Sequence, residues 1–102
     1  MLSLGFDIGS SFVKCTLFDC ASGKAVARGS SPDQEMAILS PKPGWAEQDP
    51  EEWWRHVALL AKKVVGGLAG SADAIGSIGI SYQMHGLVLV DEHQKVLRPS
   101  II

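Results

Sequence analysis

The chain has 102 residues, of which 46% are hydrophobic and 20% charged, and this is the composition of a globular domain rather than of a disordered or low-complexity segment. Nine basic and eleven acidic residues give a net charge of -2 without a block of either sign, so no nucleic acid is expected as a partner. Asp7 interrupts the apolar run after Met1 too early for a signal peptide or for a membrane span of about 20 residues, so we expect a cytoplasmic protein with no membrane partner.

Three short strands are predicted at the start of the chain. Residues 2–6 form an apolar run that ends at the turn signal of residues 7–11, and residues 12–18 alternate apolar and polar side chains. Residues 19–24 supply a second turn, after which residues 25–28 begin a third strand. This order predicts an antiparallel meander.

Both cysteines belong to the second of these strands. Cys15 lies within it and Cys20 at its end, so five residues at about 3.3 Å each separate them by roughly 16 Å. A disulfide tolerates no more than about 7 Å between Cα atoms, so we expect two reduced thiols with structural roles.

A polar stretch, residues 30–45, follows the third strand. Pro41 and Pro43 exclude a helix there, and we expect a connecting loop with one short extended segment at residues 36–39.

A helix is predicted from Asp49, the expected N-cap, with Pro50 at the first helical position and Glu52 placed to complete a capping box. We expect the helix to end at Gly66-Gly67 or at Gly70. Apolar side chains recur at helical spacing and predict one broad apolar face. They are Trp53, Trp54, Val57, Leu60, Ala61, Val64, Val65 and Leu68.

The last third of the chain reads as a strand followed by a hairpin. Residues 74–82 alternate apolar and small side chains, residues 83–86 break the run, and residues 87–90 and 96–97 are expected to pair across a turn. Residues 100–102 are apolar and carry no stop signal, which is typical of an interrupted strand or loop. The fold class is therefore α/β, with a right-handed crossover through the helix.

The turn of residues 7–11 is the first candidate site. Gly9 allows an unusual backbone conformation, the amides and hydroxyls of Ser10 and Ser11 can face an anion, and Asp7 can hold a divalent metal beside a polyphosphate. An ordinary tight turn is the alternative. Lys14 is interpreted as a solvated strand residue.

The second candidate site is the segment of Met84, His85 and Gly86, between two strand-like runs. Open α/β folds bind ligands at such strand ends, and a neutral imidazole can exchange hydrogen bonds with a sugar hydroxyl. A histidine satisfied by the local backbone is the alternative. His56 and His93 are expected to face solvent. The tryptophans are assigned to packing, with at least one of Trp53 and Trp54 in the core and Trp45 closing its loop.

Four blocks in this order resemble the FGGY carbohydrate kinases. They span residues 6–14, 43–54, 80–86 and 96–99, and so cover nearly the whole chain. The block of residues 83–86, Gln-Met-His-Gly, resembles the xylulose kinases within the family, because glycerol kinases carry a different polar segment there. Three positions depart from the usual pattern, with Ser10 in place of threonine, Tyr82 in place of a small residue and Ser100 in place of alanine.

The resemblance implies a ribonuclease H-like, actin-like ATPase domain, of which residues 1–102 form the amino-terminal part of the first of two domains. It implies ATP and Mg²⁺ as cofactors, with Asp7 near the metal and phosphates and Gly9, Ser10 and Ser11 in the phosphate loop. Met84, His85 and Gly86 match the segment that contacts the ketose.

The implied reaction is ATP-dependent phosphorylation of a ketopentose, D-xylulose to D-xylulose 5-phosphate, by a homo-oligomeric kinase. The catalytic base and the adenosine pocket are expected beyond Ile102, so no residue of this chain is expected to be the base. The alternatives are a kinase for ribulose, gluconate or a deoxy-sugar, and a non-catalytic module that packs against a partner or belongs to an actin-like regulatory protein.

Overall fold

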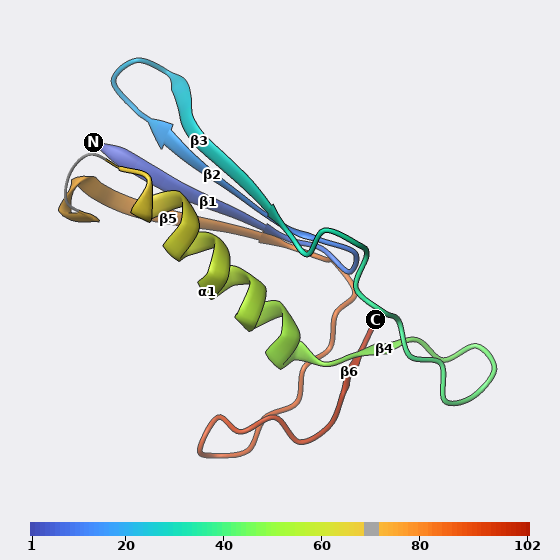
Figure 1. Cartoon of the computed structure of the whole chain (residues 1–102). Helices are drawn as coiled ribbons and strands as arrows, with labels where there is room; N and C mark the ends of the chain where they lie inside the picture. Colours follow the sequence, from blue (N-terminus) through green and yellow to red (C-terminus); the bar gives the residue numbers. More distant parts are fainter. Residues whose placement is uncertain (69–71) are drawn as a thin grey trace.

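The computed structural model describes residues 1–68 and 72–102, which form a four-stranded sheet, a long helix on one of its faces and a smaller two-stranded sheet (Figure 1). The elements in chain order are β1 (Leu2–Ile8), β2 (Val13–Asp19), β3 (Lys24–Ser31), β4 (Glu47–Gln48), α1 (Pro50–Gly66), a 3₁₀ turn (Ala72–Ala74), β5 (Ile75–Tyr82) and β6 (Ser100–Ile101).

The main sheet has the order β3-β2-β1-β5. β1 pairs antiparallel with β2, and β2 pairs antiparallel with β3, so the predicted meander is confirmed. The chain then crosses over through α1, and β5 returns parallel to β1. β3 is longer than predicted and runs to Ser31, where its side chain is buried.

Helix α1 begins where the sequence predicts. The Asp49 carboxylate accepts a hydrogen bond from the Glu51 N–H over 2.9 Å and so caps the helix. The Glu52 side chain, predicted to complete a capping box, instead faces His56, with its Oε1 3.9 Å from the imidazole Nε2. The helix ends at Gly66 with Gly67 as its C-cap, and the alternative end at Gly70 lies outside the described residues.

The core lies between α1 and the sheet. Alternation along β1 and β2 turns one apolar row toward the helix, and the helix contributes Leu60 and Val64 from the same side. The buried apolar side chains are Leu4, Phe6, Val13, Cys15, Leu17, Met36, Leu60 and Val64. At Gly29 of β3 the helix comes so close that an added Cβ would lie 2.9 Å from the Leu60 Cδ2 atom.

β5 is covered less than its neighbours. Its register with β1 places Ile78 beside Leu4 and Ile80 beside Phe6, so both isoleucines face the helix side of the sheet. Each is nevertheless 64% exposed, because α1 packs mainly over β2 and β3.

The predicted hairpin after β5 forms only in part. Residues 87–90 and 96–97 meet through the bridge of Val90 with Val96 and through a 3.0 Å hydrogen bond from the Leu97 N–H to the Leu89 carbonyl, rather than as two strands. The segment instead joins the second sheet, in which Leu39, β4, β6 and Leu87 lie next to one another in that order. The expected extended segment at residues 36–39 therefore contributes its last residue to this sheet.

His56 corrects an expectation. The sequence predicts a solvent-facing histidine, whereas its side chain is only 19% exposed and its Nδ1 lies 2.8 Å from the buried Ser31 hydroxyl. His93 is exposed, as predicted. Trp53 is half-buried and Trp54 exposed, which agrees with one core residue in the pair. In the described ranges, no helix is long and apolar enough to cross a membrane.

Candidate functional site

The two predicted sites emerge at the same edge of the main sheet. Because β1 and β5 are parallel neighbours, Asp7 lies beside Ser81 and Ile8 beside Tyr82, at the carboxyl ends of both strands. The Gln83 N–H continues this pairing and donates to the Ile8 carbonyl over 3.0 Å. Carboxyl ends of adjacent parallel strands are where open α/β sheets bind ligands.

The loop after β1 forms one wall of an open hollow of about 250 Å³. All four predicted cofactor-binding residues lie in its lining, which consists of Asp7, Gly9, Ser10, Ser11, Phe12 and Lys14. Lys14 pairs with Asp7 across β1 and β2 and therefore borders the hollow on the same face. Lys14 is exposed in β2, which agrees with its interpretation as a solvated strand residue, and alternation along β2 places it on that face.

The backbone of this loop is held by one hydrogen bond within the loop and by one from the connecting loop. The Gly9 N–H donates to the Phe12 carbonyl over 3.0 Å, and an added Cβ at Gly9 would lie 3.0 Å from that same oxygen. The Ser11 carbonyl accepts from the Met36 N–H over 3.0 Å. Among the described residues, the N–H groups of Ser10 and Ser11 donate no hydrogen bond. Free donors on a loop whose carbonyls are tied back are suited to an anion.

Asp7 is the acidic group of this hollow and is exposed at the end of β1. In the described residues no group of three or more His, Cys, Asp or Glu side chains is placed to hold a metal. Mg²⁺ beside a polyphosphate needs only one or two protein carboxylates, since phosphate oxygens and water complete its shell. A single exposed aspartate next to free amide donors therefore fits Mg²⁺ bound together with phosphates.

A second hollow, of about 390 Å³, lies on the helix side of the same strand ends. Its lining is Ile8, Trp53, Tyr82, Gln83, Gly86, Leu87 and Val88. Of the three predicted sugar residues only Gly86 lines it, where an added Cβ would lie 3.3 Å from the Gln83 Cγ atom. Met84 and His85 are exposed in the turn between Gln83 and Gly86.

Gln83 lines this hollow, and its amide nitrogen is unpaired within the described part of the chain. Its Nε2 atom is buried and has no hydrogen-bond partner among the described residues. A buried polar group left without a partner is costly, so such a donor is suited to the hydroxyl or carbonyl oxygen of a bound ligand. Gln83 belongs to the Gln-Met-His-Gly block of the sequence but is not one of the predicted sugar-binding residues, which directly follow it.

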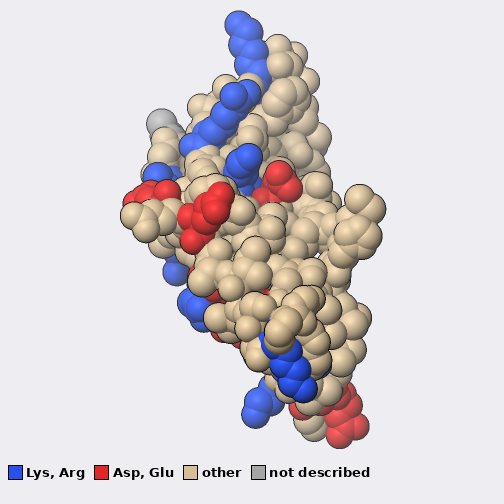
Figure 2. Space-filling model, turned by 90° about the vertical axis from the view of Figure 1, so that its right-hand side faces the viewer, with Lys and Arg blue, Asp and Glu red and all other residues tan. Residues whose placement is uncertain are grey.

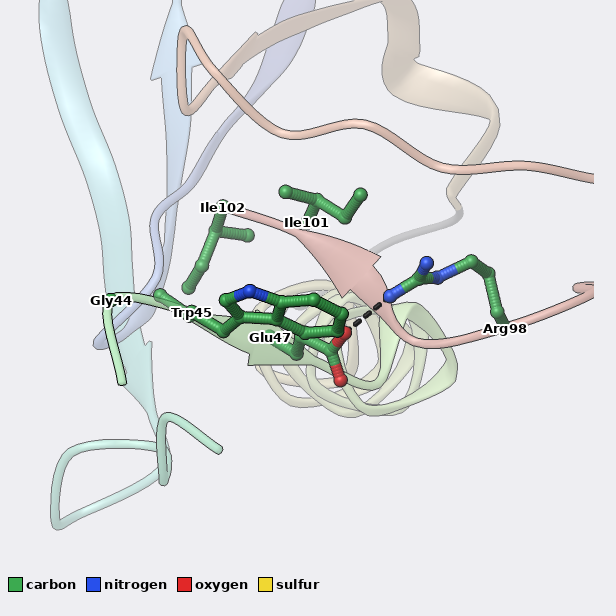
Figure 3. A pocket seen from close by; sticks show the side chains of 7 residues that line it. Gly44, Trp45, Glu47, Arg98, Ile101 and Ile102 are labelled. Atoms are coloured by element: carbon green, nitrogen blue, oxygen red, sulfur yellow. Dashed lines mark hydrogen bonds and ion pairs between the residues drawn. The ribbon is translucent and has the colours of Figure 1, made fainter. Parts of the chain in front are cut away.

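A third hollow, of about 270 Å³, is formed by Trp45 and the second sheet (Figure 3). Ile101 and Ile102 lie on one side of the Trp45 ring, and Arg98 forms an ion pair with the Glu47 carboxylate at its border. Trp45 thus closes its loop onto β4 and β6, as predicted, although it stays half exposed. The ion pair joins β4 to the segment that precedes β6.

Charged groups occupy the smaller part of the face that Figure 2 shows, which is the right-hand side of the molecule as drawn in Figure 1. Lys and Arg side chains gather in its upper part, and acidic and basic groups are mixed farther down, within a larger uncharged area.

The sheet order, the crossover helix and the two polar segments define the class of domain, and a sequence match identifies its family. The fold is a mixed α/β domain of the ribonuclease H-like, actin-like type, with two polar segments at one sheet edge. Residues 2–102 match the N-terminal domain of the FGGY family of carbohydrate kinases, and the chain belongs to this family.

Similar proteins are kinases of several sugars. The xylulose kinase of Escherichia coli K12 is 37% identical over 97% of this chain and 19% of its own length. The crystal structure of a "xyloylose kinase" from Brucella ovis matches 100% of this chain and 21% of its own, with 36% identity and a TM-score of 0.87. A gluconate kinase from Lactobacillus acidophilus, 30% identical, matches 99% of this chain and 20% of its own with a TM-score of 0.82. The chain thus spans about a fifth of the length of these relatives.

Proposed function

We propose that residues 1–102 are the beginning of the first of two domains in a kinase that transfers the γ-phosphoryl group of Mg-ATP to a ketopentose hydroxyl. The proposed reaction converts D-xylulose to D-xylulose 5-phosphate. The observation that carries this proposal is the parallel pairing of β1 with β5, which sets a phosphate-type loop and a second polar turn side by side.

The nucleotide side of the proposed site is the loop after β1. Phosphoryl transfer depends on positioning and on stabilising negative charge, and the free N–H groups of Ser10 and Ser11 are donors for phosphate oxygens. Asp7 would hold Mg²⁺, which when bound neutralises charge on the phosphates. Lys14 lies on the same face as a further positive group.

The sugar side is the segment from Gln83 to Gly86. The exposed imidazole of His85 can exchange a hydrogen bond with a sugar hydroxyl, and the buried Gln83 amide offers a second donor. Gly86 leaves the space in which Gln83 lies. We expect Met84 to cover an apolar face of the sugar, since its side chain is 85% exposed in the chain as described.

The proposed sugar, D-xylulose, has alternatives among the substrates of similar kinases. A gluconate kinase is similar over the whole chain, and so is an Escherichia coli kinase for L-xylulose and 3-keto-L-gulonate, at 35% identity. Initial rates of the full-length protein with D-xylulose, L-xylulose, D-ribulose, D-gluconate and glycerol separate these possibilities. D-Xylulose is expected to give the highest kcat/KM. A tenfold preference for another sugar would contradict the proposed substrate but not the proposed kinase activity.

We infer that the 102-residue chain alone has no kinase activity, because the base and the adenosine pocket are expected beyond Ile102. Phosphorylation of D-xylulose by the purified chain above a no-protein control would contradict this. We also infer a cytoplasmic location, for which the free thiols of Cys15 and Cys20 are the supporting observation. We further infer self-association, for which the exposed face of β5 is support in the 102-residue chain alone.

A further inference from the structure

Gln48, the second residue of β4, is a buried polar side chain to which the sequence analysis gave no role. Its residue is only 1% exposed, and its amide nitrogen lies 2.6 Å from the Ser10 carbonyl and 3.3 Å from the Ala37 carbonyl. Its amide oxygen lies 3.0 Å from the Trp53 indole nitrogen. A glutamine amide thus connects the loop after β1 with the helix and with the connecting loop.

The direction of this amide is fixed by chemistry. An indole N–H only donates, so the atom of Gln48 that meets Trp53 must be the oxygen. The nitrogen with its two N–H groups therefore meets the two carbonyls, both of which only accept. Each contact thus joins a donor to an acceptor. The opposite orientation of the amide, with nitrogen and oxygen exchanged, is excluded because it would place two donors or two acceptors together.

Holding the Ser10 carbonyl also orients the donor beside it. The C=O of Ser10 and the N–H of Ser11 belong to one planar trans peptide and point in opposite directions. Because Gln48 draws the carbonyl to its own side, the Ser11 N–H is turned to the other side, where it donates to no described residue. Met36 acts in the same way on the next peptide through the Ser11 carbonyl.

We infer that Gln48, aimed by Trp53, is a positioning residue that fixes the Ser10–Ser11 peptide for phosphate oxygens of the nucleotide. The inference rests on the proposed function for its ligand, whereas the geometry of the peptide can be measured without any nucleotide. Donors fixed before the reaction need no reorganisation during it, so loosening this peptide lowers the rate of phosphoryl transfer without changing how the sugar is held.

The first experiment uses the 102-residue chain. Amide hydrogen exchange and ¹H–¹⁵N shifts of Ser10 and Ser11 are compared in two variants. Gln48→Glu replaces the donor by an acceptor of the same shape, and Trp53→Phe removes the aiming N–H together with part of the indole ring system. Gln34→Glu is the matched control, since Gln34 is exposed in the connecting loop. Shifted Ser10 and Ser11 resonances in the first two variants, with β2 and β3 unchanged, are expected. Unchanged Ser10 and Ser11 resonances in a folded Gln48→Glu chain would overturn the inference.

The second experiment measures kinetics of the same variants in the full-length kinase. Gln48→Glu is expected to lower kcat/KM for MgATP roughly 3- to 10-fold or more, the scale of one or two lost hydrogen bonds, and to leave the KM for sugar unchanged. Trp53→Phe is expected to lower kcat/KM for MgATP less, and its KM for sugar is not part of the test because Trp53 also lines the second hollow. For Gln48→Glu, a rise in the KM for sugar as large as the rise in the KM for MgATP, or no loss of kcat or of kcat/KM for MgATP, would overturn the positioning role. If no sugar is phosphorylated by the unmodified enzyme, the proposed function fails, and the resonances of Ser10 and Ser11 still decide the geometry.

Discussion

The Gln83 N–H donates to the Ile8 carbonyl over 3.0 Å, which extends the parallel pairing of β5 with β1 by one residue past the last ladder pair. This bond sets where the chain leaves the sheet after β5. A slip of one residue would turn Asp7 and the Gln83 turn to opposite faces, because side chains alternate along each strand. The relative placement of the two polar segments thus depends on strand register.

Close packing of Gly29 against the helix gives a stability prediction. Gly29→Ala places a Cβ 2.9 Å from the Leu60 Cδ2 atom and is expected to destabilise the chain by about 1–3 kcal/mol through overpacking. Urea unfolding of the 102-residue chain measures this change. Leu60→Ala, at a fully buried site, is expected to cost about 2–5 kcal/mol.

The two changes are expected to be non-additive. Removing the Leu60 side chain makes room for the new methyl group, so the double variant should lose less stability than the sum of the two single variants. Gly79→Ala serves as the control, since its Cβ meets nothing within 4 Å. Strict additivity, or an equal loss from Gly79→Ala, would show that the helix does not press on β3 at this point.

The bond between Ser31 and His56 gives a second stability prediction. His56→Ala leaves the Ser31 hydroxyl buried without its partner, which is expected to cost about 1–3 kcal/mol of the free energy of unfolding. A double-mutant cycle with Ser31→Ala isolates the interaction. His93→Ala, at an exposed histidine, is expected to change stability by no more than about 0.5 kcal/mol. A coupling energy of zero would mean that the two side chains do not interact.

The two thiols are expected to react very differently. Cys20 is exposed, whereas burial raises the pKa of the Cys15 thiol and keeps it protonated at neutral pH. A thiol reagent should therefore label Cys20 quickly and Cys15 only as the chain opens. In a Cys20→Ser background no fast phase should remain, and fast labelling there would contradict the burial of Cys15.

The same pKa shift predicts a pH dependence of stability. The folded pKa of Cys15 is raised above the unfolded value, so its contribution is fully present below the unfolded pKa and is lost as pH rises through the folded pKa. Unfolding of the Cys20→Ser chain should become easier above about pH 8.5, where an unfolded thiol ionises. Replacing Cys15 by Ala should remove this part of the alkaline loss. If the free energy of unfolding still falls by the same amount at alkaline pH after that replacement, groups other than Cys15 cause the fall.

The face of β5 predicts self-association of the 102-residue chain. Ile78 and Ile80 are each 64% exposed on an edge strand that carries no charge or proline of its own. Sedimentation equilibrium should show reversible association, and Ile80→Lys should abolish it. Leu97→Lys, at an apolar side chain exposed in the loop after β5, is the control and should have no effect. A strict monomer at high concentration would contradict this prediction.

Local signals predicted the elements well. Strong periodicity and turn residues gave the meander, the helix and β5, and Asp49 with Pro50 gave the start of α1. The hairpin predicted after β5 is more regular than the observed one. Leu87 pairs instead with Ile101 in the second sheet, a contact that no local pattern reveals. His56 was misplaced because its partner, Ser31, lies 25 positions earlier in the chain.

For the candidate site too, local patterns in the sequence predicted the neighbouring residues but not the long-range contacts. Asp7, Gly9, Ser10 and Ser11 lie within five consecutive residues and line one hollow, so a motif could find them. Gln48 touches that loop across 38 positions, and the orphaned amide of Gln83 becomes visible only when burial is known. Polar contacts between residues far apart in the chain produce no periodic pattern in the sequence, so the sequence alone did not predict them.

The most direct test of this account is the steady-state kinetics of Asp7→Asn and His85→Ala in the full-length enzyme. Asp7→Asn is expected to lower kcat about 100-fold or more, because the lost charge serves the phosphoryl group in transfer. His85→Ala is expected to lower kcat/KM for D-xylulose roughly 3- to 10-fold with little change in the KM for ATP. If His85→Ala leaves kcat/KM for xylulose unchanged, or if Asp7→Asn acts only on the sugar, the division of this sheet edge into a nucleotide side and a sugar side is wrong.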